Sequence, residues 1–167
     1  MSVNPATEYV EASRESSGIH AYVADHGDGV PRSAIEHVTL AGREVAIATS
    51  VTAEERAVIE ECIRAVNPVS NSCFENALRM WDHSSRFQYV EGFAVRNDLD
   101  VGGIEHAWCL LDGAILVDAT TPFDHYHGVQ ITAAETLEQY LTEYPEHGIL
   151  GNHKDRFGFL REQGYTD

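Results

Sequence analysis

The stretch Ile104–Asp118, IEHAWCLLDGAILVD, decides the fold of this chain. Two apolar runs flank the dipeptide Asp112-Gly113, which is typical of tight hairpin turns because both residue types tolerate a positive φ. The pattern therefore predicts two antiparallel strands, Ile104–Leu110 and Ala114–Asp118, that belong to one sheet.

The register of this hairpin decides which side chains meet across it. Side chains alternate between the two faces of a strand, so a shift of one residue changes every pairing. A three-residue loop over 111–113, with its glycine at positive φ, sets His106 opposite Asp118. A two-residue loop sets Ala107 opposite Asp118 instead. Only the first register lets the carboxylate accept a hydrogen bond from one nitrogen of the imidazole.

A second informative stretch is Asn71–Ala77, which resembles the start of a helix. Ser72 is a good N-cap, and Glu75 three residues later completes a capping box. Cys73 is then the first residue of a predicted helix that runs to about His83. The free N–H groups and the positive end of the helix dipole favour a thiolate at this position.

Periodicity predicts the other elements. Alternating apolar residues indicate strands, and apolar residues every three or four positions after a capping box indicate helices. The predicted strands are Ile19–Ala24, Ile35–Leu40, Glu44–Thr49 and Phe87–Val95, and further helices are predicted to begin at Thr52 and Thr132. This order indicates an α+β fold, with one antiparallel sheet packed against helices.

The N-terminal residues 1–18 are polar and lack a sustained apolar period. We therefore expect a loosely held segment there, followed by a single domain over residues 19–167. A chain of 167 residues with 43% hydrophobic content suffices for one core. It has no apolar run of about 18 residues and no visible secretory signal, so a cytoplasmic protein without membrane association is expected.

The formal net charge of −16 limits the possible partners. Such a chain would repel a phosphate backbone, so nucleic-acid binding is not expected. Lys154 is the only lysine. This acid-rich, lysine-poor composition fits a salt-adapted protein and an ordinary acidic protein equally well.

The three cysteines, Cys62, Cys73 and Cys109, lack the Cys-x-x-Cys spacing of zinc or redox sites. Cys62 lies on the apolar face of its predicted helix, and Cys109 faces away from His106 on its strand. Both are expected in the core, where free cysteine is common. Cys73 is therefore the candidate nucleophile.

Four motifs in one order resemble the core of the transglutaminase-like (papain-like) superfamily of cysteine enzymes. They are Cys73 at a helix start, Val90-Glu91-Gly92-Phe93, His106-Ala107-Trp108 and Val117-Asp118-Ala119-Thr120. The family often has proline where this chain has Ala119. The small size and the lack of an obvious calcium site resemble the compact microbial or viral members.

The resemblance implies a catalytic triad and an activity. Cys73 would be the nucleophile, His106 the general base and acid, and Asp118 the orienting carboxylate, without metal or cofactor. The Cys73 N–H would form part of an oxyanion hole. The implied function is a thiol-dependent acyl-transfer enzyme, either an amide or peptide hydrolase, a deamidase or a transamidase. Its substrate would be a peptide, a protein or a small amide, and hydrolysis is favoured because water is always available.

Four further residues have two possible roles each. Asn71 is a candidate second oxyanion donor, or it shapes its loop. Asn76 points toward the site or ties down the same loop. Glu91, which interrupts an apolar strand, lines the cleft or binds a cationic substrate group, or it faces solvent at a sheet edge. Trp108 is a core residue or a wall beside the histidine.

The cluster His125-Tyr126-His127 follows the last motif. Two histidines one residue apart on a strand share a face and are possible metal ligands, but the segment is more simply expected to border the active-site cleft. Two alternatives to the enzyme remain: a catalytically inactive binding or inhibitory module, and a zinc protein that uses His106, His125 and His127.

Overall fold

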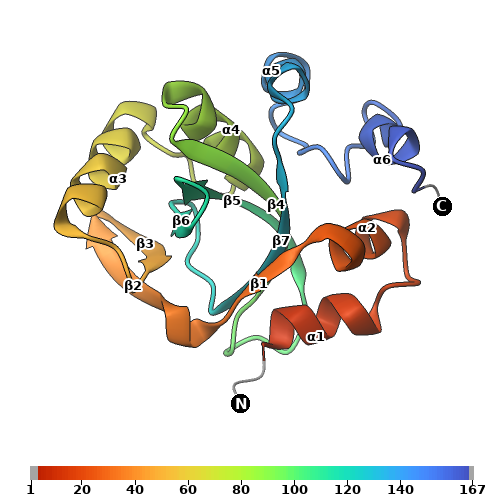
Figure 1. The fold of residues 1–167 in the computed structure, drawn as a ribbon, viewed down its shortest axis with the longest axis horizontal. Helices are drawn as coiled ribbons and strands as arrows, with labels where there is room; N and C mark the ends of the chain where they lie inside the picture. The colour runs from red at the N-terminus through yellow and green to blue at the C-terminus, as the bar shows by residue number, and fades with distance from the viewer. Residues whose placement is uncertain (1–3, 166–167) are drawn as a thin grey trace.

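The computed structural model describes residues 4–165, which form an α+β fold around one curled antiparallel sheet (Figure 1). The order of the strands is β1-β7-β4-β5-β6-β3-β2. The strands are β1 (Asp28–Val30), β2 (Ile35–Leu40), β3 (Arg43–Ala48), β4 (Phe87–Val95), β5 (Ile104–Leu111), β6 (Ile115–Asp118) and β7 (His125–Ile131). The helices are α1 (Pro5–Ala12), α2 (Gly18–His26), α3 (Ala53–Val66), α4 (Cys73–His83), α5 (Ala134–Glu143) and α6 (Gly158–Glu162), with a short 3-10 turn at Arg32–Ala34.

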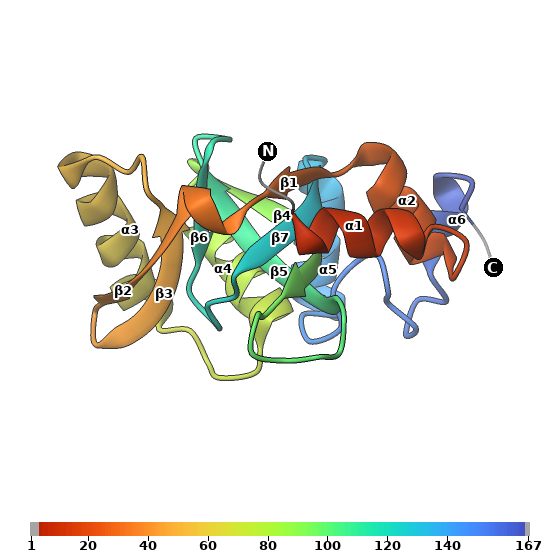
Figure 2. The ribbon, with the colours of Figure 1, turned by 90° about the horizontal axis from the view of Figure 1, so that it is seen from below.

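The sheet separates two cores. Helix α4 packs against β4 and β5 on the face that carries the larger core, which also receives α3 and α5. The opposite face carries a smaller core around Trp108, Phe123 and Tyr126. Figure 2 shows α3 at one end of the molecule and α6 at the other, with the sheet between them. The predicted α+β class is therefore confirmed.

Helices α3 and α4 begin in different ways. The predicted capping box of Thr52 and Glu55 is present at the start of α3, and Asn67 ends that helix in the left-handed conformation. Helix α4 has the predicted bounds, but its predicted capping box is absent, because Ser72 makes no side-chain cap bond. The turn that precedes α4 is held in a different way, described below.

The hairpin between β5 and β6 differs from both predicted registers. Leu110 pairs with Leu116 and not with Ala114, a shift of two residues from the predicted three-residue loop. The turn therefore consists of residues 112–114, and both Asp112 (φ 54°) and Gly113 (φ 74°) are left-handed. A shift of two residues preserves the faces of a strand. His106 and Asp118 consequently share a face but are diagonal neighbours, not opposite each other.

The N-terminal part of the chain is helical where the sequence predicted otherwise. The strand predicted at Ile19–Ala24 is wrong, because these residues lie in α2, where Ser17 accepts a hydrogen bond from the backbone N–H of His20. Ile19, Tyr22 and Val23 have helical spacing and pack into the larger core, which a short apolar run cannot reveal on its own.

Helices α1 and α5 differ from the sequence expectations in smaller ways. Within the segment predicted to be loosely held, α1 begins after Asn4, whose side chain caps it, and buries Ala6 and Val10. The packing of α1 against β7 and β4 gives this segment fixed contacts. Helix α5 begins after Ala133 without a side-chain cap, so the capping box predicted from Thr132 is also wrong.

Candidate active site

The loop before Cys73 is fixed by a side chain of the helix that it precedes. The Asn76 carboxamide accepts from the Val69 N–H (2.9 Å) and donates to the Val69 carbonyl (2.8 Å). The same amide group donates to the Thr120 hydroxyl at 2.8 Å. Asn76 therefore ties the loop to α4, as one of its two predicted roles required. It also joins the start of α4 to the loop that follows β6.

His106 and Asp118 form a buried pair on the smaller-core side of the sheet. The imidazole Nε2 donates to the Asp118 Oδ2 at 2.7 Å. The relative exposures of the two residues are 4% for His106 and 1% for Asp118. The pair forms because β5 and β6 diverge beyond the Cys109–Val117 pair, while Asp118 stays aligned with Ala46 of β3.

Cys73 lies beside the same imidazole. Burial alone lowers the pKa of His106. The charge of Asp118, its hydrogen bond and the interaction with the Cys73 thiol outweigh burial and raise the pKa of His106 to about 10. Because Asp118 occupies Nε2, Nδ1 is the ring nitrogen left for the thiol. The structure thus brings together three residues that are distant in sequence.

The Asp118 carboxylate receives three further hydrogen bonds. Tyr126 donates its hydroxyl to Oδ2 at 2.7 Å, and the backbone N–H groups of Thr120 and Thr121 donate to Oδ1 at 3.0 and 3.2 Å. The Tyr126 hydroxyl also accepts from the Phe123 N–H at 2.9 Å. Both carboxylate oxygens are therefore occupied, which fixes the orientation of the group.

Tyr126 was not among the residues singled out in the sequence. It lies between His125 and His127, so the alternation of β7 points its ring to the opposite face from theirs. The ring of Tyr126 packs against Trp108, with 4.9 Å between the centroids. The strand pattern indicates this opposite orientation. The contact with Asp118 could not be inferred, because two strands, β4 and β5, separate β7 from β6 in the sheet.

Trp108 and Asn71 have different surroundings. Trp108 is buried and stacks near His106, with ring centroids 6.0 Å apart, so it forms a wall beside the histidine. Asn71 is exposed, and its φ of 63° lies in the left-handed region that asparagine tolerates better than most residues. This conformation supports the loop-shaping role of Asn71.

Glu91 is buried in the centre of the sheet, so the solvent-facing edge position is wrong. It lies on β4, which is flanked by β5 and β7. Its exposure is 3%. The carboxylate accepts from the backbone N–H groups of Ile149 and Leu150 at 2.8 and 2.6 Å, and from the Tyr89 hydroxyl at 2.5 Å.

His125 and His127, the two other histidines of the zinc alternative, contact residues outside the His106 pair. His125 contacts the Asn97 side chain (3.1 Å), and the Nδ1 of His127 contacts the Thr7 hydroxyl (2.9 Å). Within residues 4–165, no group of three or more His, Cys, Asp or Glu side chains is placed to hold a metal. The zinc arrangement of His106, His125 and His127 is therefore not formed.

The other two cysteines are in the core, as predicted. Cys62 and Cys109 are fully buried, whereas Cys73 is only partly buried. Burial, with a contribution from Glu61, raises the pKa of the Cys62 thiol to about 12. Burial also raises the pKa of Cys109 well above its ordinary value. Both core cysteines are thus disfavoured as nucleophiles.

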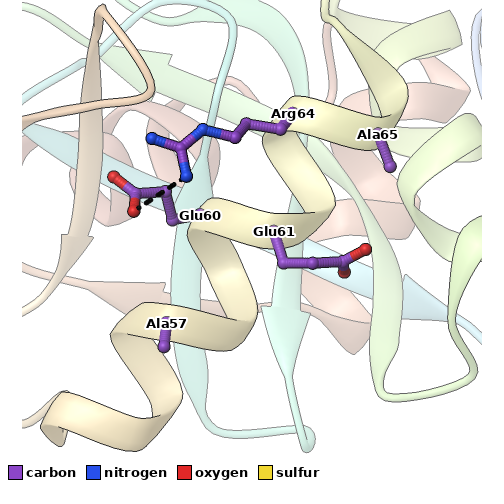
Figure 3. Close-up of a pocket in the computed structure, with 5 residues that line it drawn as sticks. All are labelled: Ala57, Glu60, Glu61, Arg64 and Ala65. Carbon is purple, nitrogen blue, oxygen red and sulfur yellow. Dashed lines mark ion pairs between the residues drawn. The ribbon is translucent and has the colours of Figure 1, made fainter.

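A hollow on the surface of α3 lies apart from the candidate active site. It is lined by Ala57, Glu60, Glu61, Arg64 and Ala65 (Figure 3). All five residues belong to α3, where Glu60 and Arg64 form an exposed ion pair at 3.4 Å. Such a pair contributes little to stability, and the hollow contains none of the predicted site residues.

Comparisons of the chain with protein-family models, with curated proteins and with solved structures gave no match. Over residues 4–165, no helix has the length and apolar character needed to cross a bilayer.

Proposed function

We propose that the protein is a thiol-dependent acyl-transfer enzyme that hydrolyses an amide or peptide bond. One observation carries the proposal: Cys73, the first residue of a helix, lies beside an imidazole whose other nitrogen is bonded to a buried carboxylate. The order of the residues and the motifs around them, which resemble the transglutaminase-like enzymes, support the same function.

The chemistry assigns one task to each residue. The Cys73 sulfur attacks the carbonyl carbon of the amide, and the resulting C–S bond replaces the C–N bond. Protonated His106 gives its proton to the leaving amine, and Asp118 keeps the ring oriented. Water then attacks the thioester carbon while His106 takes its proton. The C–S bond breaks, and the acid product leaves.

The helix start supplies a first oxyanion donor. The N–H groups of the first helical turn have no partner within their own helix, and Cys73 is the first residue of that turn. Its N–H is therefore suited to a developing negative charge on the carbonyl oxygen. The resemblance to transglutaminase-like enzymes implies the same role.

The test is a screen of peptide, isopeptide and small amide substrates, with wild type, Cys73→Ala and Cys62→Ala compared. We expect release of amine by wild type, and no activity in Cys73→Ala with its melting temperature retained. Cys62→Ala should keep activity but lose roughly 1 kcal/mol or more of stability, because it opens a cavity in the core. Activity that survives Cys73→Ala would contradict the proposal. A wild type that binds peptides without turnover would favour the inactive binding module.

A further inference from the structure

Glu91 connects the centre of the sheet to a distant part of the chain. Its carboxylate accepts two consecutive backbone N–H groups, those of Ile149 and Leu150, which are 58 and 59 residues away. Ile149 and Leu150 are themselves fully buried, with 0 and 1% exposure. A buried N–H needs an acceptor, and the carboxylate supplies one for each of these two.

The same segment packs on the first turn of α4. Gly148 has a φ of 72°, and a Cβ added there would lie 2.6 Å from the Phe74 ring and 3.0 Å from the Glu91 Oε1. Glycine is therefore required by both its conformation and its neighbours. Phe74 directly follows Cys73, so the segment 148–150 lies against the helix turn that carries the candidate nucleophile.

Glu91 also binds a neighbour on its own strand. The Tyr89 hydroxyl donates to the Glu91 carboxylate. Burial, the charge of Glu91 and its hydrogen bond raise the pKa of Tyr89, and Cys73 is close enough to contribute. Glu91 is therefore hydrogen-bonded both to Tyr89 on its own strand and to the segment 148–150, which packs on Phe74 beside Cys73.

We propose that Glu91 is the anchor that fixes residues 148–150 as one wall of the Cys73 site, and thus a positioning residue for the substrate. Its effect on kinetics rests on the proposed function, but its effect on the segment does not. A carboxylate can accept both N–H groups, whereas the amide of glutamine has one acceptor and one donor. Glu91→Gln would therefore set an N–H₂ group against a backbone N–H and release the segment.

The test compares Glu91→Gln with Glu105→Gln at pH 8, by amide hydrogen exchange and by iodoacetamide labelling of Cys73. Glu105, on the neighbouring strand β5, is the matched control, because its carboxylate also lies near this segment, at Gly151, but does not accept the two amides. In Glu91→Gln we expect exchange at Ile149 and Leu150 to rise at least about tenfold, as loss of a charged acceptor implies. Labelling of Cys73 should become faster, and Glu105→Gln should behave as wild type.

A second variant tests the anchor independently if Glu91→Gln does not fold. Gly148→Ala crowds Phe74 and the Glu91 Oε1 but keeps the charge of the carboxylate, and it should raise both exchange and labelling in the same way. A folded variant of either kind with wild-type exchange at these amides and wild-type labelling would overturn the anchor.

The two proposals fail in different ways. In an active enzyme, release of the wall should raise KM at least about tenfold, as the same loss of a charged acceptor implies, while the pH profile set by Cys73 and His106 stays unchanged. An inactive wild type with the expected exchange would remove the proposed function but leave the anchor in place. An unchanged KM in an active Glu91→Gln would remove the positioning role.

Discussion

Asp118 is the most heavily bonded residue of the site, with hydrogen bonds from His106, Tyr126 and the backbone of Thr120 and Thr121. This arrangement leads to a prediction for Asp118→Asn, which keeps the shape of the side chain but removes its charge. The amide would stabilise the imidazolium less and could hold the wrong tautomer. We expect turnover to fall by roughly two orders of magnitude or more, toward the ~10⁴-fold loss known for a serine triad. Unchanged turnover would mean that Asp118 does not orient His106.

Tyr126 offers a milder test of the same carboxylate. Tyr126→Phe keeps the ring against Trp108 but removes one hydrogen bond to Asp118 and the acceptor for the Phe123 N–H. We expect turnover to fall roughly tenfold, the equivalent of about 1.4 kcal/mol, which is in the range of one charge-assisted hydrogen bond. Tyr140→Phe is the matched control, because its hydroxyl bonds to Asp155. Equal losses in both variants would assign the effect to stability alone.

At the same scale, the sequence singles out Cys73, His106 and Asp118, which the structure brings together, but not all of the residues that support them. Cys73, His106 and Asp118 come from motif order and helix position. The contact of Tyr126 with Asp118 depends on how distant strands align, which a single chain pattern does not encode. The backbone donors Thr120 and Thr121 are local, two and three residues after Asp118, in a turn of the kind that aspartate favours. Glu91 was noticed as a break in an apolar strand, but its partners, 58 and 59 residues away, could not be inferred.

At the scale of elements, the buried carboxyl on β4 makes stability depend on pH. Burial raises the pKa of Glu91 from its ordinary 4.5 to about 7, although hydrogen bonds from Tyr89, Ile149 and Leu150 oppose this, and Glu105 adds to the increase. The folded state therefore holds the Glu91 proton more tightly than the unfolded chain does, and the carboxylate that accepts both N–H groups predominates above about pH 7. The contribution of Glu91 to the free energy of unfolding is fully present below about pH 4.5 and is lost as the pH rises through about 7.

This shift predicts how wild type and Glu91→Gln differ in their free energies of unfolding. The difference between the two pKa values corresponds to roughly 3 kcal/mol. We expect the advantage of wild type over Glu91→Gln to shrink by about this amount as pH rises from 4.5 to 8, measured by urea unfolding. If the difference in free energy of unfolding between the two proteins stays constant or grows with pH, the pKa of Glu91 is not raised in the folded state.

The elements also show where sequence patterns lose information. Strands β2 and β4 have the predicted bounds because turn residues follow both of them, at Ala41-Gly42 and at Asn97-Asp98. The β5–β6 register was wrong because Asp112-Gly113 supports more than one loop length. The sequence of α2 resembles a strand because the six residues Ile19–Ala24 fit both the two-residue period of a strand and the 3.6-residue period of a helix.

At the scale of the whole molecule, the charge of −16 sets the response to salt. Like charges repel across the surface, and this repulsion weakens as salt shortens the Debye length from about 10 Å at 0.1 M to about 3 Å at 1 M. If the acidic surface is a salt adaptation, the melting temperature, measured by circular dichroism, should rise steeply between low and molar sodium chloride. A flat curve would leave the acidic composition as an ordinary surface property without salt adaptation.

Activation of Cys73 by His106 would appear in the pH dependence of alkylation. Intact protein would be treated with iodoacetamide between pH 5 and 9, and the labelled cysteine identified by peptide mass spectrometry. We expect selective labelling of Cys73 that persists well below the pKa of about 8.5 of a free thiol. His106→Gln should lose this labelling at acidic pH. Labelling of Cys73 that follows the curve of a free thiol, with no effect of His106→Gln, would contradict the account.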